Sequence, residues 1–257
     1  MNQYTDSLTN YINNISDYQI FGKVTSIKGM ILECSGGKDI LYIGSKCNIY
    51  TRNNNKISSE VIGFRGDYAI LMPYNEIEGV GVGCRVEFLE SEPLIYPNIS
   101  WLGRVINYNA EPIDDKGFLS MGDIGYSYKN TAPPSHSRKR VGDKIDLKIK
   151  AINLFTSCCY GQRMGIFAGS GVGKSVLISM ITKYADVDIK VIGLIGERGR
   201  EVQEFLHEYL GEEGLKKSVV IVATGDESPL ARRQAAYLTM SVSEYFRDIG
   251  KNVLCIM

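Results

Sequence analysis

The segment from Ala168 to Ser175 constrains the fold of this chain more than any other part of its sequence. It reads Ala-Gly-Ser-Gly-Val-Gly-Lys-Ser, and it lies between an apolar run, Met164–Ala168, and a helical pattern, Lys174–Tyr184. Closely spaced glycines let backbone N–H groups curl around an anion, and the start of a helix adds positive potential there. The run, the loop and the helix therefore predict a P-loop, a turn that binds the phosphates of a nucleotide.

Each position of this segment has an expected role in binding ATP and Mg²⁺. The Lys174 ammonium should reach the β- and γ-phosphates, and the Ser175 hydroxyl should ligate the metal. The competing interpretation is a glycine-rich turn with an incidental lysine, which leaves the flanking strand and helix patterns unexplained. The backbone expected to surround the phosphates belongs to Gly169, Ser170, Gly171, Val172, Gly173, Lys174 and Ser175.

Apolar strands alternate with amphipathic helices after Gly161. Continuous apolar strands separated by helices are typical of a parallel sheet that is covered on both faces. The fold class is therefore predicted to be α/β, with a P-loop parallel sheet. The predicted strands are Met164–Ala168, Ile189–Ile195, Val219–Ala223 and Val253–Met257, and the predicted helices are Lys174–Tyr184, Glu201–Leu210 and Leu230–Asp248.

Glu197 and Arg198 directly follow the second of these strands. In an open parallel sheet, ligands bind at the carboxyl ends of the strands, so both side chains can face the phosphates. A carboxylate there can polarise the attacking water, and a guanidinium can offset charge on the transferred phosphoryl group. The residues alone leave a second interpretation equally open, in which both side chains only cap a helix and form surface ion pairs.

The first third of the chain has a different pattern. Short alternating runs between about 20 and 91, separated by Gly, Asn and Asp clusters, predict a small β-barrel. Before it, Leu8, Tyr11, Ile12 and Ile15 form an apolar stripe on a predicted helix over residues 2–16, which either docks a partner or packs on its own chain. The predicted domains are therefore 1–17, 18–92 and 93–257.

The charge balance argues against nucleic acid as a partner. The chain has 29 basic and 29 acidic residues, whereas proteins that grip nucleic acid usually carry a basic excess. Arg138-Lys139-Arg140 is interpreted as a solvated loop. The N-terminus lacks a secretory signal pattern, and no apolar run approaches the ~18 residues of a membrane span. A cytoplasmic location with reduced cysteines is expected.

Several motifs in sequence order resemble the ATPases of flagellar export and type III secretion. The resemblance covers about 95–257, with a weaker likeness in the barrel region. Ala168 is what export ATPases show at the first P-loop position, whereas the related catalytic subunits of rotary ATP synthases usually have Gly. The motifs lie in Leu102–Ile106, Gly161–Ser175, Gly193–Val202, Val222–Leu230, Arg232–Tyr237 and Glu244–Asp248.

The resemblance implies an ATP-hydrolysing motor subunit that energises protein export. It assigns phosphate and Mg²⁺ roles to Lys174 and Ser175, water activation to Glu197, and γ-phosphate contacts to Arg198 and Arg247. It further implies a hexameric ring with nucleotide between subunits, a stator-like regulator on the N-terminal helix, and export substrates and chaperones. Peripheral association with an export gate at the inner membrane is also implied.

Departures and alternatives accompany this resemblance. Asn153-Leu154, Cys158-Cys159-Tyr160 and Gly225 differ from common family residues, but they lie outside the phosphate motifs. Val253–Met257 resembles the strand before the Walker B aspartate, so the chain is expected to be a fragment without turnover by itself. The alternatives are a rotary synthase subunit, a ring-shaped RNA translocase, and a nucleotide-binding module without catalysis.

Overall fold

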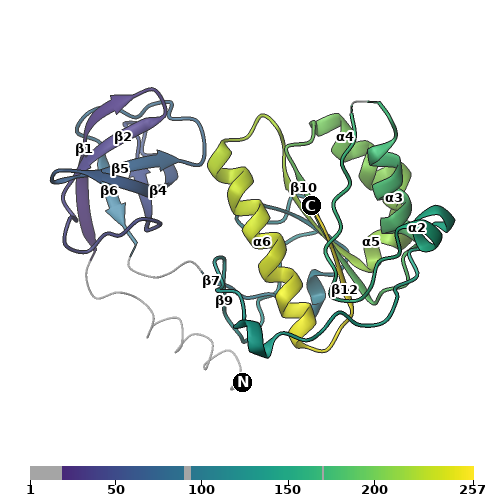
Figure 1. The fold of residues 1–257 in the computed structure, drawn as a ribbon. Coiled ribbons are helices and arrows are strands. Elements are labelled where there is room, and N and C mark those ends of the chain that lie inside the picture. Colours follow the sequence, from purple (N-terminus) through teal and green to yellow (C-terminus); the bar gives the residue numbers. More distant parts are fainter. Residues whose placement is uncertain (1–18, 90–93, 170) are drawn as a thin grey trace, which may run out of the picture. The chain divides into compact units, whose positions relative to one another are not determined.

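The computed structural model describes residues 19–89, 94–169 and 171–257 of the chain. The chain divides into two compact units, Met1–Glu92 and Pro93–Met257 (Figure 1). The helix predicted for residues 2–16 lies outside the described residues. No helix in the described part of the chain is long and apolar enough to cross a membrane.

The first unit contains a closed barrel of antiparallel strands, as the short alternating runs predict. Its strands lie in the order β1-β2-β5-β4-β3-β6. They are β1 (Ile20–Lys28), β2 (Ile31–Ser35), β3 (Lys46–Tyr50), β4 (Lys56–Arg65), β5 (Tyr68–Pro73) and β6 (Arg85–Phe88).

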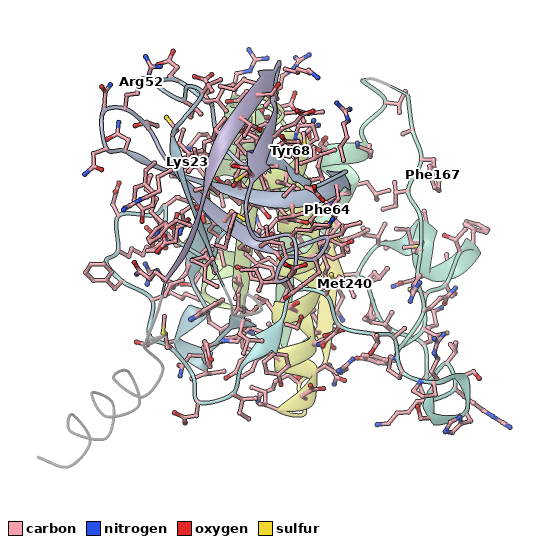
Figure 2. All side chains as sticks on the ribbon, turned by 90° about the vertical axis from the view of Figure 1, so that its left-hand side faces the viewer. Lys23, Arg52, Phe64, Tyr68, Phe167 and Met240 are labelled. Carbon is pink, nitrogen blue, oxygen red and sulfur yellow. The ribbon has the colours of Figure 1, made fainter. Side chains whose placement is uncertain are left out.

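The barrel interior is filled by the alternate apolar side chains of these strands. Val24, Leu32, Ile49 and Leu71 are essentially inaccessible to solvent, because successive side chains of a strand point to opposite faces. Gly22 allows β1 to approach β2 closely, since a Cβ atom there would lie 2.3 Å from the carbonyl oxygen of Ser35. Phe64 and Tyr68 are substantially exposed instead (Figure 2).

The second unit is built on a parallel sheet with the strand order β12-β10-β11-β8. The predicted strands at Ile189–Ile195, Val219–Ala223 and Val253–Met257 are confirmed, within a residue at either end. A two-stranded ribbon, β7 (Leu94–Ile95) with β9 (Tyr126–Ser127), lies beside this sheet. The sheet strands are β8 (Arg104–Asn107), β10 (Ile189–Ile195), β11 (Ser218–Ala223) and β12 (Val253–Ile256).

Helices cover both faces of this sheet, which confirms the predicted fold class. On one face, Ile192 and Leu194 pack against Val202 and Phe205. On the other face, α6 contacts the sheet so closely that a Cβ atom on Gly193 would lie 2.7 Å from Thr239 Oγ1. The helices are α2 (Lys150–Phe155), α3 (Lys174–Tyr184), α4 (Gly199–Glu204), the π-helical turn η3 (Phe205–Leu210), α5 (Gly211–Lys216) and α6 (Pro229–Asp248).

Two predicted elements differ from the structure. Met164–Ala168 forms no strand, and Phe167 is 96% exposed (Figure 2). An apolar run becomes a strand only when a neighbouring strand hydrogen bonds with it, and no described strand pairs with these residues. The helix predicted over Glu201–Leu210 is α-helical only as far as Glu204 and then widens into a π-helical turn.

Candidate functional site

The candidate site lies at the carboxyl edge of the parallel sheet. β10 ends at Ile195 and β11 at Ala223, and the residues after each strand turn into a helix. Parallel strands end at the same edge, so the loops after β10 and β11 are neighbours. The backbone amide of Gly196 donates to the carbonyl oxygen of Ala223 over 2.7 Å, and that of Gly225 donates to Glu197 over 3.0 Å.

The P-loop segment leads into the first turn of α3 with the backbone that its glycines permit. Gly171 and Gly173 have φ values of 75° and 94°, a region that favours glycine. Gly173 is the N-cap of α3, and Lys174 and Ser175 are its first residues. Ser170 lies outside the described residues. Gly169, Gly171, Val172, Lys174 and Ser175 are all exposed, so the segment is accessible to a phosphate ligand.

Glu197 is half-buried at this edge, and its surroundings favour a proton on its carboxyl group. Burial raises the pKa of Glu197, and a hydrogen bond with Glu201 raises it further, whereas the charge of Lys174 opposes both effects. These interactions bring the P-loop lysine, the predicted catalytic glutamate and a second carboxyl group together. Glu201 was not predicted as a site residue, although it lies in the Gly193–Val202 motif.

Arg198 points away from buried structure and remains available to a ligand. Its side chain is 78% exposed, and its Nη1 atom lies 4.0 Å from Oε1 of Glu201. An exposed ion pair of this length contributes little to stability. Arg198 can therefore leave Glu201 for a developing negative charge at small cost.

Arg247 does not join these residues within the chain. It lies in the last turn of α6, whereas the first turn of that helix begins at the carboxyl edge of the sheet. A helix of this length spans roughly 30 Å, so Arg247 cannot reach the P-loop of its own chain. Its Nη2 atom pairs with Oδ1 of Asp248 at 2.7 Å. The γ-phosphate contact expected for Arg247 is therefore not formed within one chain.

The structure adds Arg232 to the candidate site. This residue lies in the first turn of α6, just after the loop that follows β11. Its Nε atom is buried without a hydrogen-bond partner among the described residues. A buried donor left unpaired is costly and needs an explanation. Only its place in the Arg232–Tyr237 motif could have indicated it from the sequence.

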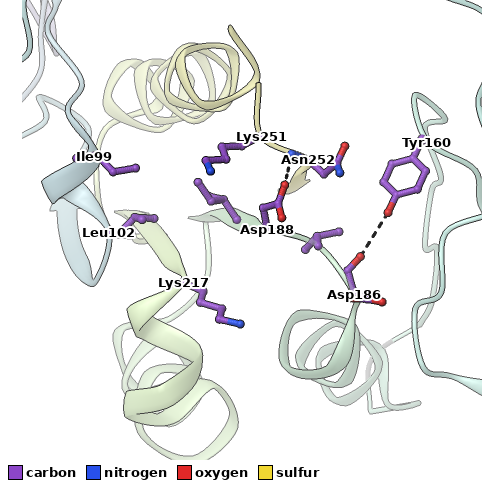
Figure 3. Close-up of a pocket in the computed structure, with 10 residues that line it drawn as sticks. Ile99, Leu102, Tyr160, Asp186, Asp188, Lys217, Lys251 and Asn252 are labelled. Carbon is purple, nitrogen blue, oxygen red and sulfur yellow. Dashed lines mark hydrogen bonds between the residues drawn. The ribbon is translucent and has the colours of Figure 1, made fainter. Parts of the chain in front are cut away.

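A cavity lies at the opposite edge of the sheet. It measures about 510 Å³ and is lined by Asp186, Asp188, Lys217 and Lys251 among others (Figure 3). Asp188 accepts a hydrogen bond from the backbone amide of Asn252 over 2.8 Å. These residues precede or begin the strands, so this cavity is separate from the P-loop edge.

The residues at the carboxyl edge fit a nucleotide with its metal. The glycine turn and the start of α3 suit phosphates, and Lys174 supplies the positive charge. Mg²⁺ commonly takes few protein ligands, with waters and substrate phosphates completing its shell. Ser175 suits that role, and the described residues hold no cluster of three metal-binding side chains that would compete with it.

Comparison with family models assigns both units. The model for the beta-barrel domain of the ATP synthase alpha/beta family matches residues 17–90, and the model for its nucleotide-binding domain matches residues 148–257. This chain belongs to the ATP synthase alpha/beta family. The part of this chain that matches the nucleotide-binding model includes the P-loop, Glu197, Arg198 and Arg232.

Within this family, the chain is similar to flagellum-specific ATP synthases. The chain is 48% identical over 251 residues to the flagellum-specific ATP synthase of Caulobacter vibrioides, covering 98% of this chain and 56% of the relative. It is 41% identical to the flagellum-specific ATP synthase of Borreliella burgdorferi, covering 98% of this chain and 57% of that relative. The chain thus spans a little over half the length of these curated relatives.

A solved structure shares the fold of both units. The assembled ATPase EscN, from the type III secretion system of enteropathogenic E. coli, matches with a TM-score of 0.83 and 36% identity. The match covers 92% of this chain and 56% of the EscN chain. A second EscN structure, in complex with its central stalk EscO, matches with a TM-score of 0.82.

Proposed function

We propose that this chain belongs to an ATP-hydrolysing motor subunit that energises protein export through a flagellar or type III secretion apparatus. The observation that carries the proposal is the proximity of Lys174, on the P-loop helix, to Glu197, whose pKa that lysine influences. Phosphoryl transfer to water needs both a phosphate-binding cation and a group that orients the water. Both lie at one edge of the sheet.

Each residue has a part in the proposed reaction. Lys174 and the amides of Gly169–Gly173 would hold the β- and γ-phosphates, and Ser175 would ligate Mg²⁺, whose charge would offset that of the phosphates. Glu197 accepts a hydrogen bond from the attacking water and then its proton. Arg198 stabilises the charge that develops on the transferred phosphoryl group. Arg232, in the first turn of α6, is a further cation at this edge of the sheet.

The assembly and the partners are part of the same proposal. EscN is an assembled ATPase and forms a complex with a central stalk, which supports a hexameric ring for this protein. In such a ring, Arg247 would act only toward a neighbouring subunit. A stator-like regulator on residues 2–16, export substrates with their chaperones, and a cytoplasmic position at an inner-membrane export gate complete the proposal.

A rotary ATP synthase subunit is the second candidate, because the family includes both kinds of protein. Ala168 at the first P-loop position and the flagellum-specific relatives favour export. The two candidates differ in whether secretion of exported proteins depends on this subunit. Deleting the gene should stop export of flagellar or type III substrates and leave oxidative phosphorylation intact.

The binding of ATP tests the proposed site directly. Lys174→Ala removes a charge-assisted contact to phosphate and should lower affinity for a fluorescent ATP analogue by about tenfold or more. Lys183→Ala is the matched control, because Lys183 is an exposed lysine at the other end of the same helix. Equal affinities in wild type and Lys174→Ala would contradict the P-loop assignment.

A further inference from the structure

Three alternate glycines lie in the turn that precedes β6 of the barrel. Gly79 and Gly83 have φ values of 77° and 89°, so both adopt a backbone conformation that favours glycine. Gly81 does not adopt this conformation, and what it provides is room. A Cβ atom on Gly81 would lie 2.9, 3.0 and 3.1 Å from Nη2, Nε and Cζ of Arg52. The middle glycine therefore allows the Arg52 guanidinium to approach the backbone.

Arg52 rests on this glycine turn with both its side chain and its backbone. Three guanidinium atoms would lie at nearly the same distance from the added Cβ atom, so the plane of the group faces Gly81. The backbone amide of Arg52 donates to the carbonyl oxygen of Gly79 over 3.0 Å. The turn that carries Arg52 is itself closed by the buried Thr51, whose Oγ1 accepts from the backbone amide of Asn55 over 3.0 Å.

A second arginine, at the start of β6, is held by aromatic rings. The Cζ atom of Arg85 lies 4.4 Å from the ring centroid of Phe21 and 4.7 Å from that of Tyr50. A cation at this distance from a ring is attracted by its electrons. Neither Arg52 nor Arg85 forms an ion pair with a carboxylate in the described part of the chain. Both guanidinium groups are thus held in place without a carboxylate that neutralises them.

One cavity joins the two arginines. It measures about 470 Å³, and its lining includes Tyr50, Asn54 and Val82 beside the arginines. We name it the arginine cavity. No acidic residue lines it. Glu78 is exposed and precedes the glycine turn, but it is not among the lining residues. A ligand in this cavity therefore meets two positive charges.

The strands around the arginine cavity add more positive than negative charge. Lys23 is exposed and pairs with Arg85 in the register of β1 and β6, and Lys56 pairs with Tyr50 in the register of β3 and β4. Glu87 lies on the same face as Arg85, two residues further along β6. It is 9% exposed, and its carboxylate accepts a hydrogen bond from the Tyr50 hydroxyl over 2.8 Å. One largely buried carboxylate does not balance the four cations.

The lining of the cavity indicates the kind of anion that fits. Guanidinium groups bind carboxylates and phosphates through parallel N–H donors. Val82 is 62% exposed and offers an apolar contact that aliphatic side chains can use, whereas a free phosphate cannot. The Tyr50 ring already packs on Arg85, which disfavours the stacking of a base on it. A peptide with carboxylate and aliphatic groups therefore fits better than a nucleotide or a phosphate ion.

We propose that the arginine cavity docks an acidic segment of a protein partner, whose carboxylates pair with Arg52 and Arg85. Because both guanidinium groups are already held in place, little side-chain entropy is lost when the segment binds. The site lies in the barrel unit and uses no residue of the proposed ATPase reaction. It therefore adds a binding function that does not depend on that reaction.

Binding of a fluorescein-labelled hexaglutamate peptide tests the arginine cavity, in the longest form of the protein that its gene encodes. Arg52→Gln removes one guanidinium and should weaken binding by about tenfold, measured by fluorescence anisotropy. Arg65→Gln is the matched control. It removes the same charge from an exposed arginine at the other end of β4 and should leave the affinity unchanged. Equal losses in the two variants, or no binding to the wild type, would overturn the proposal.

Gly81→Ala separates the position of Arg52 from its charge. The variant keeps every charge, but the new Cβ atom displaces the guanidinium, so binding of hexaglutamate should weaken by about threefold or more. Wild-type affinity in this variant would overturn the proposal. Inorganic phosphate and a thymidine hexanucleotide are the competing probes. Tighter binding of either one than of hexaglutamate would assign the cavity to a phosphate ligand and overturn the acidic segment.

Discussion

The backbone amide of Gly225 donates a hydrogen bond to the carbonyl oxygen of Glu197 over 3.0 Å. This bond ties the loop after β11 to the loop after β10, so the backbone of Glu197 is fixed by a second strand. A Cβ atom on Gly225 would lie 3.1 Å from the carbonyl oxygen of Gly196, which leaves little spare room there. Glu197 is thus held by the sheet edge itself, and its side chain alone is free to respond to a ligand.

Glu201 should set the pH at which Glu197 becomes active. Burial and the hydrogen bond with Glu201 raise the pKa of Glu197, and a general base must be ionised to accept a proton. Glu201→Gln removes the neighbouring negative charge, so the pKa of Glu197 should fall. The acidic limb of the kcat profile should therefore move to lower pH.

The matched control for this shift is Glu212→Gln. Glu212 is an exposed carboxylate in the first turn of α5, and its replacement should leave the profile in place. Steady-state phosphate release between pH 5 and 9 measures both variants. A profile of Glu201→Gln that overlays the wild type would show that the carboxyl pair plays no part in the reaction.

Gly193→Ala should destabilise the second unit. The added Cβ atom would lie 2.7 Å from Thr239 Oγ1 on α6, and overpacking of this kind typically costs about 1–3 kcal/mol. Thr239→Ala removes the clashing oxygen, so the double variant should be more stable than Gly193→Ala alone. Urea denaturation of the three variants measures this coupling. If the losses in the free energy of unfolding were additive, residue 193 and residue 239 would not be in contact.

Asp114 should make stability depend on pH below 4. Burial opposes its ionisation, but the hydrogen bonds from Arg104, Val105 and Lys116 outweigh burial and hold the pKa at about 2. Because folding lowers the pKa of Asp114, its carboxylate stabilises the folded protein at pH values above about 4, the pKa of an aspartate in the unfolded chain. That stability is lost as the pH falls toward 2. The whole contribution is on the order of 2 kcal/mol.

Asp114→Asn tests this contribution. The variant should be less stable than wild type at pH 7, because it leaves the Arg104 charge without its partner, and its stability should fall less steeply between pH 5 and 3. Asp123→Asn, an exposed carboxylate of the same loop, should keep the steep fall. Parallel pH curves for Asp114→Asn and wild type would contradict the role of the ion pair.

The elements that the sequence predicts correctly are those with a local signal. The glycines and Lys174 predict the start of α3, and the continuous apolar runs predict β10 and β11, because burial on both faces leaves a distinct pattern. The run at Met164–Ala168 has the same pattern yet forms no strand, since strand formation depends on a partner that periodicity does not reveal.

Interactions of individual side chains are harder to predict. The Arg104–Asp114 ion pair and the burial of the Arg232 Nε atom depend on the tertiary fold, and the pairing of Glu197 with Glu201 depends on the turn into α4. The reach of Arg247 within its own chain is also hard to predict. Its motif suggested a phosphate contact, but the length of α6 places it at the far edge of the sheet. A sequence motif shows which residue types are present, but whether a side chain can reach the phosphates depends on where the helix places it.

The measurement that tests the account most directly is the comparison of ATP binding and ATP hydrolysis in Glu197→Gln, made in the longest form of the protein that its gene encodes. Glu197 is expected to orient water and not to bind ATP, so affinity for ATP should be unchanged while turnover falls by about a hundredfold or more. Unchanged turnover with normal ATP affinity would contradict the account and leave Glu197 as a residue that only begins a helix.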